Sequence, residues 1–245
     1  MTRDAGRERI SLPEDGTVRE LEPREREQVG RHWLARAESE LSTASVCVRV
    51  ARGVLDYGAV PEVTWLATRA VADEVRHARL CHALAELYLG EPLPFPRARS
   101  IGEASFGDAP PELNALLLLV LQSCINEGIA TAYLQENLRL ASAPAARAVI
   151  HELLRDDIEH ARLGWAHLAS ASVDEAARRH VGLALPTLLR LGRQAWSKEP
   201  TFAAFDCPGH GCLAGFRHAA IVDAAFEQLI LPGFSYLGLS GAAGT

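Results

Sequence analysis

Residues 73–80 read DEVRHARL and residues 156–163 read DDIEHARL. Each segment contains an acidic pair, a histidine three residues after the second acid, and the sequence His-Ala-Arg-Leu. Residues three apart lie on one face of a helix, so a carboxylate and an imidazole at this spacing can reach a common ion. If roughly a tenth of positions are acidic, the nine histidines produce about one such pair by chance. A single copy is therefore typical of a solvated helix face, whereas two matching copies indicate a shared role.

The sequence around these segments predicts helices throughout. Apolar residues at helical spacing, interrupted by proline and glycine, predict helices over about 24–57, 61–89, 110–140, 144–170 and 214–230. The SVDE sequence at 172–175 predicts the start of a further helix, which we expect Pro186 to kink. No stretch shows the period-two alternation of a strand bounded by turns. The predicted fold class is all-α.

The helices divide the chain into three parts. Residues 1–22 are polar and lack helical periodicity, which predicts a flexible N-terminal tail. Residues 23–170 contain two helical hairpins joined by the Pro/Gly-rich connection 91–110, which predicts a four-helix bundle with one long crossover. Residues 171–245 are predicted to form a C-terminal helical extension packing on the bundle, either as a cover over one opening or as a dimer surface. Bundles with this connectivity include the ferritin-like group, which builds metal sites from inward-facing side chains.

The first helix of each hairpin supplies a further acid. Glu40 precedes Glu74 by 34 residues, and Glu127 precedes Asp157 by 30. Such separations place the two acids of each pair at about the same height in an antiparallel hairpin with a short turn. Glu127 also interrupts the apolar sequence LLLLVLQSCINEGIA at 116–130. A charge there is expensive unless it is paired or bound to a cation.

Charge balance supports a site with two metal ions. Four carboxylates from these positions match two divalent cations, with His77 and His160 bound as neutral ligands. Carboxylate and imidazole ligands suit iron or manganese, and the absence of thiolate pairs argues against structural zinc. Glu38 is the alternative to Glu40 on the first helix, but it faces a different direction.

Four segments carry a resemblance to a known group of proteins: RAESELS (36–42), DEVRHARLC (73–81), SCINEG (123–128) and HARLGW (160–165). They resemble the ferritin-like di-iron carboxylate superfamily, and more narrowly a bacterial ferritin-like subgroup, over about residues 30–170. The resemblance implies two iron ions, with manganese as the alternative. The ligands that it implies are Glu40, Glu74, His77, Glu127, Asp157 and His160. Asp157 departs from the pattern, which usually has glutamate there, and this leaves open a weaker, differently coordinated or absent second metal.

Asp73 and Asp156 precede the two motifs. In relatives such an acid holds a ligating histidine of the opposite helix through its other nitrogen. We therefore expect Asp156 near His77 and Asp73 near His160, with two solvated acids as the alternative.

Two further side chains are candidates for catalytic roles. Thr131 follows Glu127 by four residues, and Cys81 follows His77 by four. Both offsets are similar to those of the bacterial multicomponent monooxygenases, where the threonine lies beside the O2 site. The alternatives are a threonine bonded to its own helical turn and a cysteine that fills the core.

The sequence favours a non-haem di-iron oxidase or oxygenase that uses molecular oxygen to oxidise a small organic substrate by hydroxylation, N-oxygenation or desaturation. The alternatives are a ferroxidase or iron-handling protein, a di-manganese catalase-like protein, and a metal-free helical interaction protein. The chain carries no flavin or ferredoxin module, so we expect electrons from an external donor.

Bulk properties limit the partners and the location. A net charge of −6 gives no reason to expect nucleic acid or an anionic membrane as partner. No apolar run follows the N-terminus, and the apolar stretch at 113–121 is shorter than a membrane span. We expect a cytoplasmic protein, and a homodimer is left open.

Overall fold

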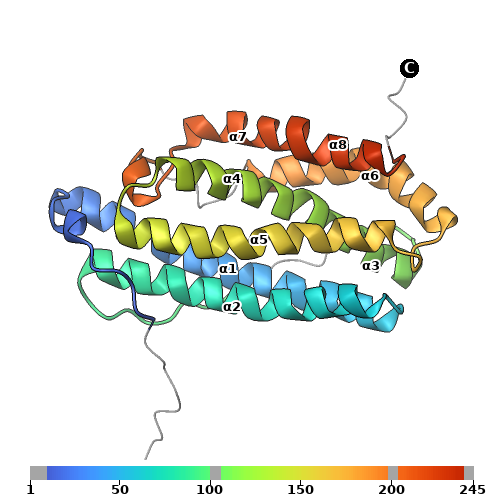
Figure 1. Ribbon diagram of the computed structural model, residues 1–245, viewed down its shortest axis with the longest axis horizontal. Coiled ribbons are helices and arrows are strands. Elements are labelled where there is room, and N and C mark those ends of the chain that lie inside the picture. The colour runs from blue at the N-terminus through green and yellow to red at the C-terminus, as the bar shows by residue number, and fades with distance from the viewer. Residues whose placement is uncertain (1–9, 100–105, 198–203, 240–245) are drawn as a thin grey trace, which may run out of the picture.

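The computed structural model describes residues 10–99, 106–197 and 204–239 (Figure 1). Its α-helices are α1 (Pro23–Asp56), α2 (Pro61–Leu89), α3 (Pro111–Leu119), α4 (Glu127–Leu140), α5 (Pro144–Ala169), α6 (Glu175–Trp196), α7 (His218–Ala225) and α8 (Leu231–Tyr236). The segments η2 (Val120–Asn126) and η5 (Phe226–Ile230) are π-helical, and η1 (Gly16–Arg19), η3 (Pro208–His210) and η4 (Gly215–Arg217) are 3₁₀-helical. Across these residues the only β pairing is an isolated bridge between Cys207 and Cys212. The all-α prediction is confirmed.

Local sequence sets most helix ends. A proline occupies the start of four helices, where its missing N–H costs no hydrogen bond; these are Pro23, Pro61, Pro111 and Pro144. Gly90 ends α2 in the left-handed conformation at φ +75°, which glycine adopts at little cost. The side chain of Asp174, within the SVDE sequence that predicted a helix start, accepts a hydrogen bond from the Ala177 N–H and caps α6.

The four longest helical segments pack as two hairpins. Helix α1 packs along α2, α4 packs along α5, and the hairpins meet where α2 contacts α5 and α1 contacts α3. Helices α3 and α4 form one continuous helical run with η2 between them, so the predicted helix over 110–140 contains a π-helical segment that the sequence did not indicate. Two glycines let neighbouring helices approach this segment closely: Gly164 of α5 faces Cys124, and Gly192 of α6 faces Ile125.

The C-terminal extension covers one side of these helices. Figure 1 shows α6, α7 and α8 running along the α4 side, away from α2. Helix α6 contacts η2, and α7 contacts α4. Pro186 lies inside α6, and the helix continues through it to Trp196. The last predicted helix, 214–230, extends further, through η5 and α8 to Tyr236.

The loop before α7 joins the extension to the two hairpins. The Trp33 indole N–H donates to the His210 carbonyl at 3.1 Å, and the Asn137 amide donates to the Gly211 carbonyl at 3.0 Å. Gly211 has φ +83°, and a Cβ at this position would lie 2.5 Å from a Trp33 ring carbon. Only glycine fits both the backbone conformation and the space.

The N-terminal residues 10–22 differ from the prediction. Val18 is buried, and Ile10, Leu12 and Leu21 pack on the core between the hairpins. Asp15 accepts a hydrogen bond from the Ala145 N–H at the start of α5. The described part of the predicted flexible tail is therefore packed, because its few apolar side chains find a core that local periodicity does not indicate. Residues 1–9 lie outside the described ranges.

Within the described residues, one helical run, Pro111–Leu140, is long and apolar enough to cross a membrane by length and composition alone. Within the protein, 67% of its most apolar window is buried. A position in the protein core therefore accounts for its composition.

Candidate metal centre

Two overlapping groups of buried acids and histidines lie between the hairpins. Within each group the potential ligand atoms are within 4.8 Å of one another. One group is Glu74, Glu127, Asp157 and His160, and the other is Glu40, Glu74 and His77. The structure therefore gathers all six residues that the sequence nominated as ligands, and Glu74 belongs to both groups. Buried carboxylate–histidine groups of this kind can hold metal ions, and their composition leaves the metal's identity open.

The two histidines present the same nitrogen to the cluster. His77 Nδ1 lies 3.8 Å from a Glu74 oxygen and 3.7 Å from Asp157 Oδ1. His160 Nδ1 lies 3.1 Å from Glu74 Oε1 and 3.5 Å from Asp157 Oδ1. Two ligands at about 2.1 Å from one ion at right angles or wider are about 3.0–4.2 Å apart. The spacing of these atoms fits ligands around an ion.

Unpartnered atoms provide the test of that fit. Four of the inward-facing atoms are buried and have no hydrogen-bond partner: Glu74 Oε2, His77 Nδ1, Asp157 Oδ1 and His160 Nδ1. A buried polar atom without a partner is costly, and native proteins leave few of them. His77 Nδ1 belongs to one ligand group, His160 Nδ1 and Asp157 Oδ1 belong to the other, and Glu74 belongs to both. An ion bound in each group would give these atoms partners.

The outer nitrogens of both histidines face the predicted acids. His77 Nε2 lies 3.2 Å from Asp156 Oδ2, and His160 Nε2 lies 3.5 Å from Asp73 Oδ2. Each acid comes from the opposite helix, as the sequence predicted, and neither is a solvated surface acid, since Asp156 is fully buried and Asp73 is partly buried. A carboxylate behind a ligating imidazole fixes the ring orientation and the protonated nitrogen.

Arginines anchor Asp156. Arg69 Nη2 lies 3.2 Å from Asp156 Oδ1, and Arg76 forms a close ion pair with Oδ2. Burial alone would raise the pKa of Asp156, but the His77 hydrogen bond and the Arg76 guanidinium outweigh it and hold that pKa well below its usual range. For His77, burial acts to lower the pKa, and the neighbouring Asp156 and Glu74 carboxylates raise it to about 10.

Glu40 has a cationic neighbour that the sequence did not predict. Arg36, one helical turn before it, donates its Nε–H to Glu40 Oε1 at 2.5 Å, and both side chains are buried. Burial raises the pKa of Glu40, Arg36 opposes this, and the result is a pKa of about 7. The alternative acid, Glu38, lies outside the cluster and pairs with Arg99 at 2.7 Å.

Glu127 is supported by the π-helical segment. Its backbone N–H bonds to the carbonyl of Gln122, five residues earlier, as a π turn requires. The same turn brings the Gln122 side-chain amide to Glu127 Oε1 at 2.8 Å. Asn126 in turn donates its amide N–H to Gln122 Oε1 at 3.3 Å. Burial first, and then the nearby Asp157 and Glu74, raise the pKa of Glu127 well above its usual range.

A cavity of about 250 Å³ adjoins the cluster. Four of the nominated carboxylates form part of its wall, which also includes Arg36, Ser39, Thr43, Gln122, Asn126, Ala195 and Trp196. The last two come from the end of α6, so the C-terminal extension closes part of this cavity.

Neither of the two predicted catalytic side chains, Thr131 and Cys81, is part of the wall of this cavity. Thr131 is buried and its hydroxyl has no hydrogen-bond partner, but it is not part of the cavity wall. Cys81 is fully buried in the core cluster, and burial, followed by the Glu40 carboxylate, raises the pKa of its thiol. Cys47, which the sequence analysis did not single out, lies with Glu127 and His160 around a smaller hollow. Its spacing of seven from Glu40 places it on the same helix face.

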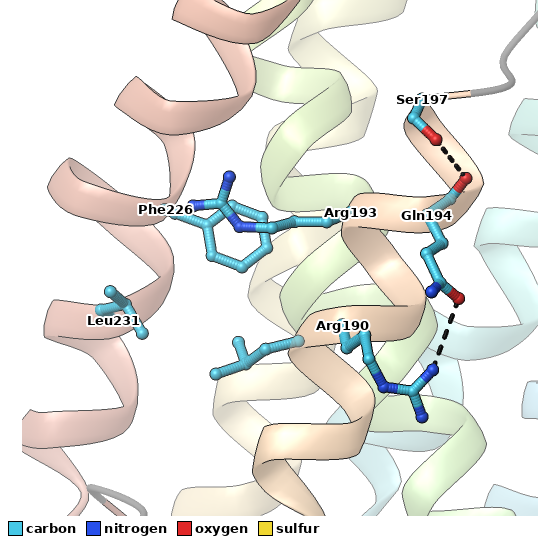
Figure 2. Close-up of a pocket in the computed structure, with 7 residues that line it drawn as sticks. Arg190, Arg193, Gln194, Ser197, Phe226 and Leu231 are labelled. Atoms are coloured by element: carbon cyan, nitrogen blue, oxygen red, sulfur yellow. Dashed lines mark hydrogen bonds between the residues drawn. The ribbon is translucent and has the colours of Figure 1, made fainter. Parts of the chain in front are cut away.

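A second depression lies on the surface between α6 and the η5–α8 region (Figure 2). It has a volume of about 590 Å³ and an apolar wall that includes Leu189, Phe226 and Leu231. Figure 2 shows Arg193 stacked on the ring of Phe226, with its guanidinium carbon 4.0 Å from the ring centre. Among the residues that the structure describes, no carboxylate or histidine lines this depression. The acids and histidines that could take part in chemistry gather instead at the internal cavity.

No protein family, curated protein or solved structure matches this chain.

Proposed function

We propose that this chain is a ferritin-like, non-haem di-iron oxidoreductase that uses O2 to oxidise a small organic substrate. The observation that carries the proposal is the pair of buried ligand groups that share Glu74 and open onto a cavity of about 250 Å³. Two groups with a common carboxylate suit two metal ions, and the cavity suits a small molecule beside them.

The proposal assigns each ligand to one of two ions. Glu40 and His77 would hold one ion, and Glu127, Asp157 and His160 would hold the other. Glu74, which belongs to both groups, could supply a ligand to either ion. Bound ferrous ions supply electrons and open coordination positions for O2. The protein supplies the rest: Asp156 and Asp73 orient the histidines, and the apolar packing of η2, α5 and α6 limits the access of water.

The cavity favours an enzyme over iron storage. An iron-storage site needs a path for iron and no pocket for an organic molecule. Here Ala195 and Trp196 of the extension form part of the wall of a cavity beside the proposed ligands. Ferroxidase or iron-handling activity and a di-manganese catalase-like reaction use the same kinds of ligand and are the alternative functions. Electrons from an external donor and a cytoplasmic location belong to the same proposal.

Metal stoichiometry and O2 consumption test the proposal. The chain is loaded with Fe(II) without oxygen, and bound iron per chain is measured for the wild type, Glu74→Gln, Glu40→Gln and Glu127→Gln. We expect two ions in the wild type, none in the shared-ligand variant and one in each of the others. Glu38→Gln, an acid on the same helix but outside the cluster, is the matched control and should retain two.

Oxygen is then added with a chemical reductant. Catalytic O2 consumption with no iron bound beyond two per chain supports the oxidase or oxygenase. Accumulation of mineral iron would replace it with storage, and rapid O2 release from peroxide by the manganese-loaded chain would replace it with catalase activity. A chain that binds no metal above background would refute a metal enzyme altogether.

A further inference from the structure

Arg36 is a buried cation in the wall of the cavity and is not a metal ligand. Its exposed fraction is 6%. Its Nε–H is used by Glu40, and its guanidinium carbon lies 5.3 Å from the centre of the Tyr133 ring. The terminal nitrogens of an arginine form a planar fork that matches a carboxylate. These nitrogens are the cationic donors that the wall offers to a molecule in the cavity.

The charges of the site favour an anion there. Two divalent cations balance the four carboxylates Glu40, Glu74, Glu127 and Asp157, with both histidines neutral. Arg36, which is ion-paired with Glu40, then leaves the buried site with one net positive charge, which is costly. One negative charge in the adjoining cavity would restore the balance.

Asn126 supplies a second, neutral recognition point. Its amide N–H donates to Gln122 Oε1, and the Gln122 amide donates to Glu127 Oε1. These hydrogen bonds fix the orientation of the Asn126 amide, because its nitrogen is used as the donor. The remaining atom, Oδ1, is buried without a hydrogen-bond partner, and the residue lines the cavity. An O–H or N–H of a bound molecule would satisfy this acceptor.

We propose that the cavity binds a small carboxylic acid that also carries a hydroxyl or amine, with the carboxylate on Arg36 and the O–H or N–H on Asn126 Oδ1. The Trp196 side chain in the same wall offers an aromatic surface to the rest of the molecule. This inference rests on the proposed function, because it identifies the substrate class of the same site.

Equilibrium binding tests the inference without turnover. The chain is loaded with Zn(II), which does not react with O2, and its zinc content is verified. Calorimetry then measures the affinity for three probes of similar size: mandelate, which has both groups, mandelamide, which lacks the charge, and phenylacetate, which lacks the hydroxyl. The probes are compared in the wild type, Arg36→Met, Arg36→Lys and Asn126→Ala. Arg31→Met changes an exposed arginine of the same helix and is the matched control.

We expect Arg36 to determine the preference for the carboxylate and Asn126 to determine the preference for the hydroxyl. The wild type and Arg31→Met bind mandelate about 10- to 100-fold more tightly than mandelamide and about 3- to 10-fold more tightly than phenylacetate. Arg36→Met loses the preference for mandelate over mandelamide, and Arg36→Lys keeps part of it. Asn126→Ala loses only the preference for mandelate over phenylacetate. If Arg36→Met fails to fold, the lysine and alanine variants still decide the two contacts.

Two results would overturn the inference. Equal affinity of the wild type for all three probes would exclude a hydroxy- or amino-carboxylate site. A preference for mandelate that survives in both Arg36 variants would show that the carboxylate binds the metal or another group instead. Neither result depends on O2 consumption. A chain with the predicted binding but no oxidase activity would refute the proposed reaction and leave the binding inference standing.

Discussion

Gly164→Ala tests how closely α5 must approach the π-helical segment beside the proposed metal centre. A Cβ at position 164 would lie 2.5 Å from Cys124 Sγ, 2.9 Å from Ser123 Cβ and 3.0 Å from the Cys124 backbone nitrogen. Rotation of the Cys124 side chain would relieve only the first of these contacts. The other two involve Cβ and backbone atoms, so α5 and η2 must move apart.

The magnitude follows from two opposing effects. Overpacking of this kind costs about 1–3 kcal/mol of folding free energy, and replacing a helical glycine by alanine returns up to about 1 kcal/mol. We expect a net loss of about 1–2 kcal/mol, which lowers Tm by about 2–8 °C in a protein of this size. Because α5 carries Asp157 and His160, the separation should also weaken metal binding at the group that contains Glu127.

Thermal unfolding and metal titration of Gly164→Ala and Gly182→Ala provide the assay. Gly182 is a matched control in α6, where the nearest atom to an added Cβ is Leu239 Cδ2 at 4.0 Å. That variant should gain about 0.5–1 kcal/mol and keep its metal affinity. If Gly164→Ala is as stable as the control and binds metal normally, the close approach of α5 to η2 is not required and the reasoning is refuted.

Three further predictions concern other parts of the molecule. Burial first, and then Arg36, lower the pKa of His32 to about 3. Between pH 6.5 and 3 the unfolded chain therefore binds a proton at this residue that the folded chain excludes. As the pH falls through this range, His32 lowers the free energy of unfolding by up to about 1.4 kcal/mol per pH unit. Urea unfolding of His32→Gln at pH 7, 5 and 4 should show a shallower loss than the wild type, and parallel curves would contradict this. Asp156→Asn should weaken metal binding about 10- to 100-fold in competition titrations, while Glu152→Gln, which alters another partner of Arg76, should not; equal effects would exclude a role behind His77. Gly211→Ala should lower Tm more than Gly238→Ala, because both positions have positive φ but only the first adds a clash with Trp33; equal losses would show that the clash is relieved without cost.

Helix positions were predictable where local chemistry sets them. Prolines at helix starts and the left-handed Gly90 delimit α2 at the predicted residues 61–89, and α1 differs from its prediction by one residue at each end. The π-helical segment was not predictable, because the apolar sequence around Cys124 reads as ordinary helix. Its wider turn is accommodated by contacts with glycines from two later helices, and such contacts leave no mark on local periodicity.

The same distinction applies to the site. The repeated acid-x-x-His spacing and matched upstream acids were enough to nominate six residues that the structure brings together. Gln122 was missed because it reaches Glu127 across five residues, a spacing that does not share a face in an α-helix. Arg36 stands one turn before Glu40, where a helical Arg–Glu pair on a solvated surface has the same sequence pattern. A buried Arg–Glu pair beside a site and a solvated surface pair therefore look the same in the sequence. Only their burial, which the sequence does not show, distinguishes them.

The two copies of the repeated motif are arranged symmetrically, but the residues beside Glu40 and Glu127 are not. The two copies are used reciprocally: Asp156 faces His77, and Asp73 faces His160. The helices that supply the remaining acids break this symmetry, since Arg36 accompanies Glu40 whereas Gln122 accompanies Glu127. A symmetric arrangement suffices to hold two like ions. The cavity wall therefore contains a cation from α1 and two amides from η2. A wall with two kinds of polar group can hold an unsymmetrical molecule in one orientation.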